Sequence, residues 1–433
     1  MVFSNDPALV ERLKRLKKSI RVGIVGVGLM GRSLFFQICM TPGVECVALC
    51  DLDIERAIEA ARRLNRENRV VSNDAETRQA FGDGFLVICR EGDLLARTES
   101  VDVVVDATGS VIDGGKIAFT AILNRKHLIM INAEADLIFG PYLAHLASQN
   151  NVVYSTCDGD QPAVTKRLID DIRLWGFEVV MAGNIKGFLD RHANPETIAL
   201  EADKRSLDHR IAAAMTDGTK LCIEMALIAN SSGYTVLRSG MRGPVASHVS
   251  DILHLFDFQE IRRQKRAVVD YVLGAEPGGG VFVVGYCDDP YQRSMLSYYK
   301  MGSGPFYLFY RPYHMCHVEA VASVAEAYLD GRAHMQPRYG FRTNVYAYAK
   351  KDLKKGEELD GIGGFTCYGL IEDCEDGGNV GLPICLADGV VLNRDIERNE
   401  KISFQDITYD PTRFDFVVHH KAVETARENV AVL

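Results

Sequence analysis

RVGIVGVGLMG, residues 21–31, is the stretch that decides how the first part of the chain folds. Its beginning, residues 22–25, is short, apolar and rich in β-branched side chains, so it predicts a buried strand. Residues 33–40, just beyond it, form an apolar stretch typical of a helix. The sequence therefore predicts a strand, a glycine turn and a helix in immediate succession.

The glycines of this stretch follow the spacing G-x-G-x-x-G. The first permits a tight turn, the second lets the backbone approach a pyrophosphate, and the third lets the helix pack on the strand. The start of the helix then presents N–H groups and a positive dipole end to the phosphates. Between a strand and a helix, this motif predicts a dinucleotide-binding loop rather than an ordinary turn. The predicted cofactor contacts in this loop are Gly26, Gly28, Leu29, Met30 and Gly31.

The next predicted strand, residues 44–50, ends at Asp51. An acidic residue about 20 positions beyond the glycine loop is placed to bind the ribose hydroxyls of NAD. Arg56 lies on the following helix, where a cation would meet the 2′-phosphate of NADP. An alternative for Asp51 is a helix N-cap. The sequence predicts NAD or NADP and leaves the choice between them open.

Further strands are expected at residues 101–107, 127–131 and 152–156, with helices between them. This alternation predicts an α/β fold with a Rossmann doubly wound parallel sheet. Ligands bind such sheets at the carboxyl ends of the strands. Four residues that follow two of these strands are therefore further predicted cofactor contacts: Thr108, Gly109, Asn132 and Glu134.

Composition limits the class of protein. The 433 residues are 47% hydrophobic and 25% charged, as in globular proteins, and the net charge of −9 argues against nucleic-acid or membrane partners. Residues 1–18 form a basic amphipathic stretch without the apolar region of a signal peptide. The eleven cysteines include no C-x-x-C pair, so reduced thiols and a cytoplasmic location are expected.

The middle of the chain supplies the candidate catalytic groups. A strand is predicted at residues 177–185, and Lys186 follows it. The segment Thr216-Asp217-Gly218-Thr219-Lys220 precedes an apolar helix, where it could hold an anion or simply cap the helix. We predict Lys186, Lys220 and Asp217 as catalytic residues, because reduction of a carbonyl needs a proton donor and positive charge near the new alkoxide. The predicted substrate contacts are Asp158, Asp160, Asn184, Asp203 and Arg311.

Residues 20 to about 330 resemble the homoserine-dehydrogenase-like NAD(P)-dependent oxidoreductases. The resemblance is carried by the stretches VGIVGVGLMG, VVVDATG, LIMINAEADL, VVYSTCDGDQP, GNIKGFLD and TDGTKLCIE. One subgroup carries a C-terminal SAF domain, and some of its members replace the usual 1-deoxy-D-xylulose 5-phosphate reductoisomerase (DXR-like proteins). Homoserine dehydrogenases usually have an Asn-Lys pair after the fifth strand, whereas this chain has Asn132-Ala133-Glu134. This departure argues against plain homoserine dehydrogenase activity.

From about residue 339 the composition changes, and a short repeat appears in KKDLKKGEEL at 350–359 and RDIERNEKI at 394–402. This region resembles the small, β-rich SAF domain. It would either reach over the active site or bridge subunits, and the lack of a convergent polar cluster favours the second role. We therefore predict a dinucleotide-binding domain at 1–160, an α+β substrate and dimerisation domain at 161–338, and an SAF-like module at 339–433.

The resemblance implies NAD(P)H-dependent reduction of a small, polar, phosphorylated carbonyl compound, specifically a reductoisomerase-like reaction of 1-deoxy-D-xylulose 5-phosphate in isoprenoid synthesis. If the carbon skeleton rearranges, some of the carboxylates should bind Mg²⁺ or Mn²⁺; the sequence does not identify the metal ligands. The alternatives are a dehydrogenase of a sugar acid or of the homoserine type, and an NAD(H)-binding sensor or scaffold. The expected partners are a small-molecule substrate and further copies of the chain, as a homodimer or larger homo-oligomer.

Overall fold

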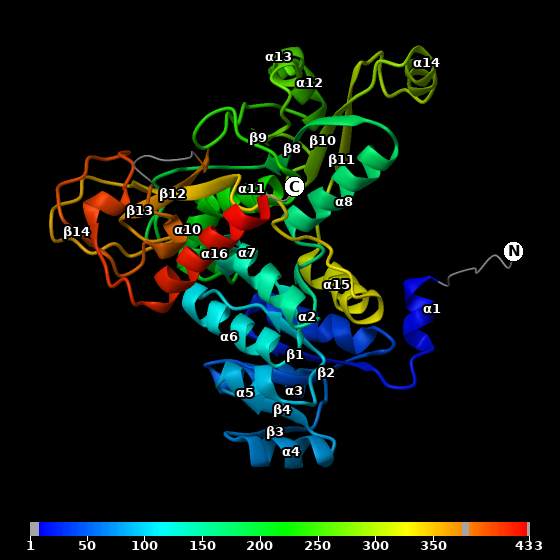
Figure 1. Ribbon diagram of the computed structural model, residues 1–433, viewed down its shortest axis with the longest axis vertical. Helices are drawn as coiled ribbons and strands as arrows, with labels where there is room; N and C mark the ends of the chain where they lie inside the picture. The colour runs from blue at the N-terminus through cyan, green and yellow to red at the C-terminus, as the bar shows by residue number, and fades with distance from the viewer. Residues whose placement is uncertain (1–7, 375–380, 431–433) are drawn as a thin grey trace, which may run out of the picture. The chain divides into compact units, whose positions relative to one another are not determined.

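A computed structural model of the protein describes residues 8–374 and 381–430. The chain divides into two compact units. Figure 1 shows the elements, coloured by residue number from blue at the N-terminus to red at the C-terminus. Unit 1 comprises Met1–Asp160 and Met315–Gln336, and unit 2 comprises Gln161–His314 and Pro337–Leu433. Of the basic stretch predicted at 1–18, the structure shows helix α1 at Leu9–Lys14, while residues 1–7 lie outside the described part.

Unit 1 is built on a sheet of seven parallel strands in the order β3-β4-β2-β1-β5-β6-β7. Its strands are β1 (Ile20–Val25), β2 (Val44–Cys50), β3 (Asn68–Val70), β4 (Leu86–Cys89), β5 (Val103–Asp106), β6 (His127–Met130) and β7 (Tyr154–Thr156). The predicted Rossmann-like α/β fold is confirmed. The strand order reverses at β1, so the carboxyl ends of β1 and β5 form the switch point where such sheets bind ligands. Strand β3 was not predicted, because its three partly exposed residues carry no apolar run.

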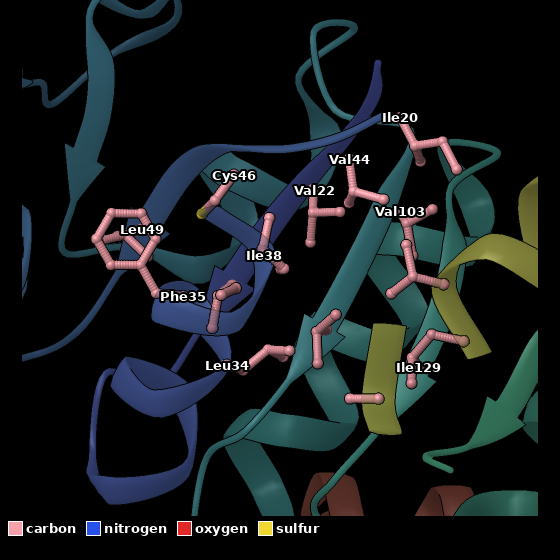
Figure 2. Close-up of a cluster of buried hydrophobic side chains, with 14 of the residues drawn as sticks. Ile20, Val22, Leu34, Phe35, Ile38, Val44, Cys46, Leu49, Val103 and Ile129 are labelled. Carbon is pink, nitrogen blue, oxygen red and sulfur yellow. The ribbon is translucent and has the colours of Figure 1, made fainter. Parts of the chain in front are cut away.

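Helices cover both faces of this sheet. They are α2 (Leu29–Met40), α3 (Ile54–Arg63), α4 (Asp74–Gly82), α5 (Gly92–Arg97), α6 (Val111–Leu123), α7 (Ala133–Gln149) and α15 (Cys316–Asp330). Side chains of α2, α3 and α15 form one hydrophobic core with the strands beneath them. Figure 2 shows part of this core, in which Leu34, Phe35 and Ile38 of α2 lie near Val22 and Leu49 of the sheet.

Residues 337–433 share unit 2 with residues 161–314, so the predicted limit at 338/339 does not appear in this division. Helix α15 marks a second difference from the predicted domain limits. The sequence places it in the second domain, 161–338, but residues 315–336 belong to unit 1. The reason is its apolar face, since Ala320, Val324 and Ala327 are buried in the core shared with α2. Packing between segments that are distant in the sequence leaves no local pattern to predict.

Unit 2 contains a mixed sheet in the order β11-β10-β8-β9, with β8 and β9 parallel and the other pairs antiparallel. Its strands are β8 (Glu178–Lys186), β9 (Val268–Leu273), β10 (Val281–Tyr286) and β11 (Phe306–Arg311). Its helices up to this point are α8 (Gln161–Leu174), α9 (Ala199–Lys204), α10 (His209–Thr216), α11 (Thr219–Ser232), α12 (Ile252–Leu255), α13 (Phe258–Arg263) and α14 (Pro290–Tyr298), with a 3-10 turn η1 at Val249–Asp251.

The C-terminal part of unit 2 has small antiparallel strand pairs, which confirms the predicted β character of this region. The elements are β12 (Thr343–Ala349), β13 (Cys367–Asp373), η2 (Ile384–Leu386), β14 (Val391–Leu392), η3 (Phe404–Asp406), β15 (Ile407–Thr408) and the helix α16 (Phe414–Val430). The two sequence repeats contact each other, because Leu353 and Ile396 exchange backbone hydrogen bonds of 2.9 and 3.0 Å. Helix α16 was not predicted, and the SAF identity of the module stays a prediction.

Two further observations concern the cysteines and the helices. All eleven cysteines are free thiols. Within the part of the chain that the structure describes, no helix combines the length and the apolar character needed to span a bilayer.

Candidate active site

The glycine loop of unit 1 adopts the geometry that its spacing predicts. Gly26 has a φ of +90°, and a Cβ there would lie 2.6 Å from the carbonyl oxygen of Ala107. A Cβ on Gly31 would lie 1.8 Å from the carbonyl oxygen of Gly26. Real Cβ atoms do not approach backbone this closely, so both positions exclude any side chain. The loop is thereby held against the end of β5 while α2 packs directly on it.

Gly28 differs from the other two glycines because a Cβ there would meet no atom within 4 Å. It is the N-cap of α2, with an extended backbone and no side-chain cap. The first N–H groups of a helix have no partner inside the helix, and here they belong to Leu29, Met30 and Gly31. The space at Gly28 and these donors together suit a pyrophosphate group.

Asp51 is tied to this loop. Its Oδ2 accepts a hydrogen bond of 2.7 Å from the N–H of Val27, and its Oδ1 accepts one of 2.9 Å from Asp53. A carboxylate has further lone pairs to accept ribose hydroxyls, so the geometry is compatible with the predicted NAD contact. Arg56, the cation predicted to meet a 2′-phosphate, forms an exposed ion pair of 3.1 Å with Asp53 instead.

The ends of β5 and β6 meet in a polar cluster. The Asn132 amide donates hydrogen bonds to Thr108 Oγ1 (3.0 Å) and to the Ser110 carbonyl (2.9 Å). Asp106, which is fully buried, accepts the N–H of Thr108 at 2.9 Å. A Cβ on Gly114 would lie 2.4 Å from Asn132 Nδ2 and 2.5 Å from Asp106 Oδ2, so a side chain there would displace this cluster. Thr108 and Asn132 are thus brought together as predicted cofactor residues, whereas Gly109 is exposed and Glu134 is half-buried in the first turn of α7.

Two buried carboxylates in unit 1 were missed by the sequence analysis. Burial raises the pKa of Asp106 to about 6, and it also raises the pKa of Asp136 to about 6. Asp136 accepts hydrogen bonds from Tyr154 and from Thr156, the latter at 2.6 Å. The signal for Asp106 is visible in the sequence, since an aspartate ends the apolar run VVVD at the ligand edge of the sheet.

Of the predicted substrate contacts in unit 1, Asp158 is buried and engaged. Its carboxylate lies 3.5 Å from Nε2 of His334 and accepts the N–H of Gly159 at 2.9 Å. Its own N–H donates to Ser323 Oγ at 2.8 Å. Asp158 therefore connects the segment after β7 to α15 and to His334 beyond it. Asp160, the other predicted substrate contact in this segment, is half-buried.

In unit 2, Lys186 stands at the carboxyl end of β8. Its Nζ donates a hydrogen bond of 2.8 Å to the carbonyl of Met215, and burial lowers its pKa. A lysine whose pKa is lowered towards neutral pH is suited to proton transfer. Residues Asn184 and Arg311 both pair with Val281 of β10, from opposite sides, so they lie in the same row of this sheet.

The predicted Asp217 is fully buried and forms an ion pair of 2.8 Å with Lys350. Lys350 also donates to the carbonyls of Ala193 (2.6 Å) and Gly364 (2.7 Å). The Asp217 carboxylate accepts the N–H of Thr219 at 2.8 Å, and burial raises its pKa although Lys350 opposes the shift. Asp217 thus anchors the start of α11 to the C-terminal part of the chain. Lys350 was not predicted, because nothing in the sequence separates it from the exposed Lys351.

The remaining predicted residues are more scattered. Lys220 is half-buried in the first turn of α11. Asp203 is exposed on α9 and contacts His209 at 2.8 Å, and the guanidinium of Arg311 lies 4.8 Å from the ring centre of Tyr313. Asn184 is buried and donates a hydrogen bond to Gln161, while Asn184 Oδ1 and Gln161 Nε2 have no partner among the described residues.

The described residues contain no group of three or more His, Cys, Asp or Glu side chains arranged to hold a metal ion. The carboxylates predicted to contact substrate illustrate why: Asp158 is engaged by His334 and Asp203 by His209. Within residues 8–374 and 381–430, the structure therefore gives no ligand set for the predicted Mg²⁺ or Mn²⁺.

Comparison with known proteins supports the oxidoreductase class. Residues 159–320 match the family model described as "oxidoreductase DRL, catalytic domain". Together with the glycine loop, this match supports an NAD(P)-dependent oxidoreductase. The chain is also 32% identical over 77 residues to glycosyl hydrolase family 109 protein 3 of Phocaeicola vulgatus. That match covers 18% of this chain and spans 13% of the length of the curated relative.

Among solved structures, similar folds include UDP-N-acetylglucosamine 3-dehydrogenase GnnA from Acidithiobacillus ferrooxidans. It is 14% identical with a TM-score of 0.40, and the match covers 73% of this chain and 91% of that one. Another is GenD2 from gentamicin A biosynthesis in complex with NAD, 14% identical with a TM-score of 0.38 and coverage of 74% and 89%. Similarity at this level carries no information on the substrate.

Proposed function

We propose that this chain is an NAD(P)H-dependent reductase of a small phosphorylated hydroxy-ketone or aldehyde. The observation that carries the proposal is the glycine loop, in which Gly26 and Gly31 admit no side chain and Asp51 binds the loop N–H of Val27. The specific substrate we propose is 1-deoxy-D-xylulose 5-phosphate. It rests on the motifs that resemble the homoserine-dehydrogenase-like proteins, and the family model over 159–320 is compatible with it.

The two units divide the work in this proposal. In unit 1, the N–H groups at the start of α2 would hold the pyrophosphate and Asp51 the ribose. The bound nicotinamide would supply the hydride. In unit 2, Lys186 would give a proton to the new alkoxide and its charge would stabilise that oxygen as it forms. Since the Lys186 ammonium has three N–H groups and Met215 accepts one, donors remain for a substrate.

The experiment follows oxidation of NADPH and NADH by the purified chain with 1-deoxy-D-xylulose 5-phosphate, with and without a divalent metal. We expect turnover with the sugar phosphate. Turnover with a sugar acid or homoserine instead would contradict the proposed substrate but support the proposed NAD(P)H-dependent reductase activity. No oxidation of either cofactor with any of these compounds would contradict the proposal.

A variant of Lys186 tests its role. Lys186→Gln should lower kcat by about 10²–10⁴-fold, the range for loss of a general acid. In the parent protein, reduction should slow as the pH rises through the lowered pKa of Lys186, and this decline should be absent from the variant. Lys355→Gln, which removes the same charge from an exposed turn, is the matched control and should leave kcat unchanged. Equal effects of the two variants would remove Lys186 from the mechanism.

A further inference from the structure

A strongly basic hollow lies in unit 2, away from the predicted catalytic lysines. Its volume is about 720 Å³, within the range of small-molecule sites. We call it the basic pocket. Its lining includes one acidic side chain, Glu178, and six basic ones: Arg173, Arg262, Arg263, Lys265, Arg266 and Arg342. This excess of positive charge contrasts with the net charge of −9 for the whole chain.

Half of these basic side chains have no carboxylate partner. Arg262, Arg263 and Arg266 form ion pairs with Glu178 (2.8 Å), Glu260 (2.8 Å) and Asp373 (3.6 Å), respectively. Across the described residues, no carboxylate lies within 4.0 Å of the charged groups of the other three, Arg173, Lys265 and Arg342. Like charges gathered in one hollow repel each other, and a bound anion would relieve that repulsion.

A buried hydroxyl in the same lining also lacks a partner. Tyr234 lines the basic pocket and is 2% exposed, and its OH has no hydrogen-bond partner among the described residues. The Arg173 guanidinium lies 5.5 Å from the centre of its ring. A buried tyrosine hydroxyl normally finds a partner, so this donor beside an uncompensated arginine points to a missing acceptor.

The basic pocket is separate from the Lys186 end of unit 2. It is lined by Glu178, Val179 and Val180, which begin β8, whereas Lys186 ends that strand. Eight residue steps along a strand span roughly 26 Å. A ligand in the basic pocket would therefore not be the compound that Lys186 protonates.

We propose that the basic pocket is a second binding site, which takes an organic anion carrying two or more phosphate groups. Guanidinium groups bind phosphate oxygens in pairs, and three uncompensated cations match the charge of a diphosphate. The Tyr234 hydroxyl would donate to one of its oxygens. The site would hold this ligand whether or not the nicotinamide cofactor or the carbonyl substrate is bound.

Calorimetric titration of the full-length chain with inorganic pyrophosphate, without cofactor or substrate, tests the proposal. We expect saturable binding that weakens at least tenfold in the double variant Arg173→Gln/Lys265→Gln and severalfold in Tyr234→Phe. The control Arg78→Gln/Lys18→Gln removes the same charge from exposed positions of unit 1 and should bind as the parent does. Lys186→Gln and Gly28→Ala should also bind pyrophosphate unchanged, which separates this site from the Lys186 end of β8 and from the glycine loop.

The proposal is overturned by no saturable binding, by an equal loss in the unit 1 control, or by loss of binding in Lys186→Gln or in Gly28→Ala. The first result would leave the pocket without a phosphate ligand, and the second would indicate a general charge effect. Loss in Lys186→Gln would place pyrophosphate at the Lys186 end of the sheet, and loss in Gly28→Ala would place it at the glycine loop. Thermal unfolding midpoints of all variants confirm that each remains folded.

Discussion

The glycine loop of unit 1 and the Asp217–Lys350 pair of unit 2 teach different lessons about how a site is built. Gly26 and Gly31 are five residues apart, and neither position has room for a Cβ. The backbone atoms that exclude it belong to Ala107 at the end of β5 and to Gly26 itself. Asp217 and Lys350 are separated by more than a hundred residues and meet only in the folded chain. The first region depends on shape, and the second depends on charge removed from water.

Breaking the buried ion pair should have the largest effect on stability. Lys350→Met leaves the Asp217 carboxylate buried without its cation and removes hydrogen bonds to Ala193 and Gly364. Loss of one partner of a buried pair costs about 3–5 kcal/mol. Denaturant unfolding measures this change. Lys351→Met removes an exposed ion pair with Glu357, and its expected cost is below about 1 kcal/mol. Equal losses would show that the buried pair has no special role.

The glycine loop can be broken in two distinct ways. Gly31→Ala places a methyl group against the Gly26 carbonyl, so it should destabilise unit 1 by about 1–3 kcal/mol or more. Gly28→Ala has open space around it, so stability should remain and dinucleotide affinity should fall. Unfolding curves and NADH titrations of both variants separate shape from ligand contact. A Gly28→Ala protein that binds NADH as tightly as the parent would contradict the pyrophosphate assignment.

Asp106, a buried aspartate of unit 1, differs from Asp217 because its hydrogen-bond partners include no cation such as Lys350. Its pKa, raised by burial to about 6, exceeds the unfolded value of about 3.9. Between these values the folded chain holds more protons than the unfolded chain, so stability falls as the pH rises from about 4 to 6. Asp106→Asn should reduce this fall by on the order of 3 kcal/mol, as measured by unfolding at several pH values. Burial raises the pKa of Asp136 in the same direction, so part of the pH dependence of stability should remain in the Asp106→Asn variant.

The smallest expected effect concerns the choice of cofactor. Asp51→Asn keeps the acceptor for the Val27 N–H but removes the charge that favours ribose hydroxyls, so NADH affinity should fall about tenfold, or 1.4 kcal/mol. Arg56→Gln should change NADPH affinity by less, because Asp53 already binds that cation. A larger loss of NADPH binding in Arg56→Gln than of NADH binding in Asp51→Asn would make NADP the cofactor.

These contrasts explain what the sequence could predict. The parallel sheet, the glycine loop and the cluster of Thr108 with Asn132 follow from short apolar runs and the residues that end them. The partners of Asp217 and Asp158 could not be predicted, because Lys350 and His334 are distant in sequence and resemble ordinary surface residues there. For the same reason the sequence could not place residues 315–336 in unit 1, since the apolar face of α15 packs on residues distant in sequence.

The basic pocket was missed on similar grounds. Its cations come from α8, from α13 and the segment after it, and from Arg342 just before β12, and each alone resembles a solvated charge. Only the fold brings them to one end of β8. A positive site in an acidic chain is therefore visible in the structure and not in the composition.

The most direct test of the account is a fluorescence titration of the purified chain with NADH and with NADPH, alongside Gly28→Ala. We expect saturable binding of at least one of the two cofactors, weakened in the variant while its unfolding curve matches that of the parent. Absence of saturable binding by both cofactors, or unchanged affinity in the variant, would contradict the claim that this loop holds a nicotinamide dinucleotide.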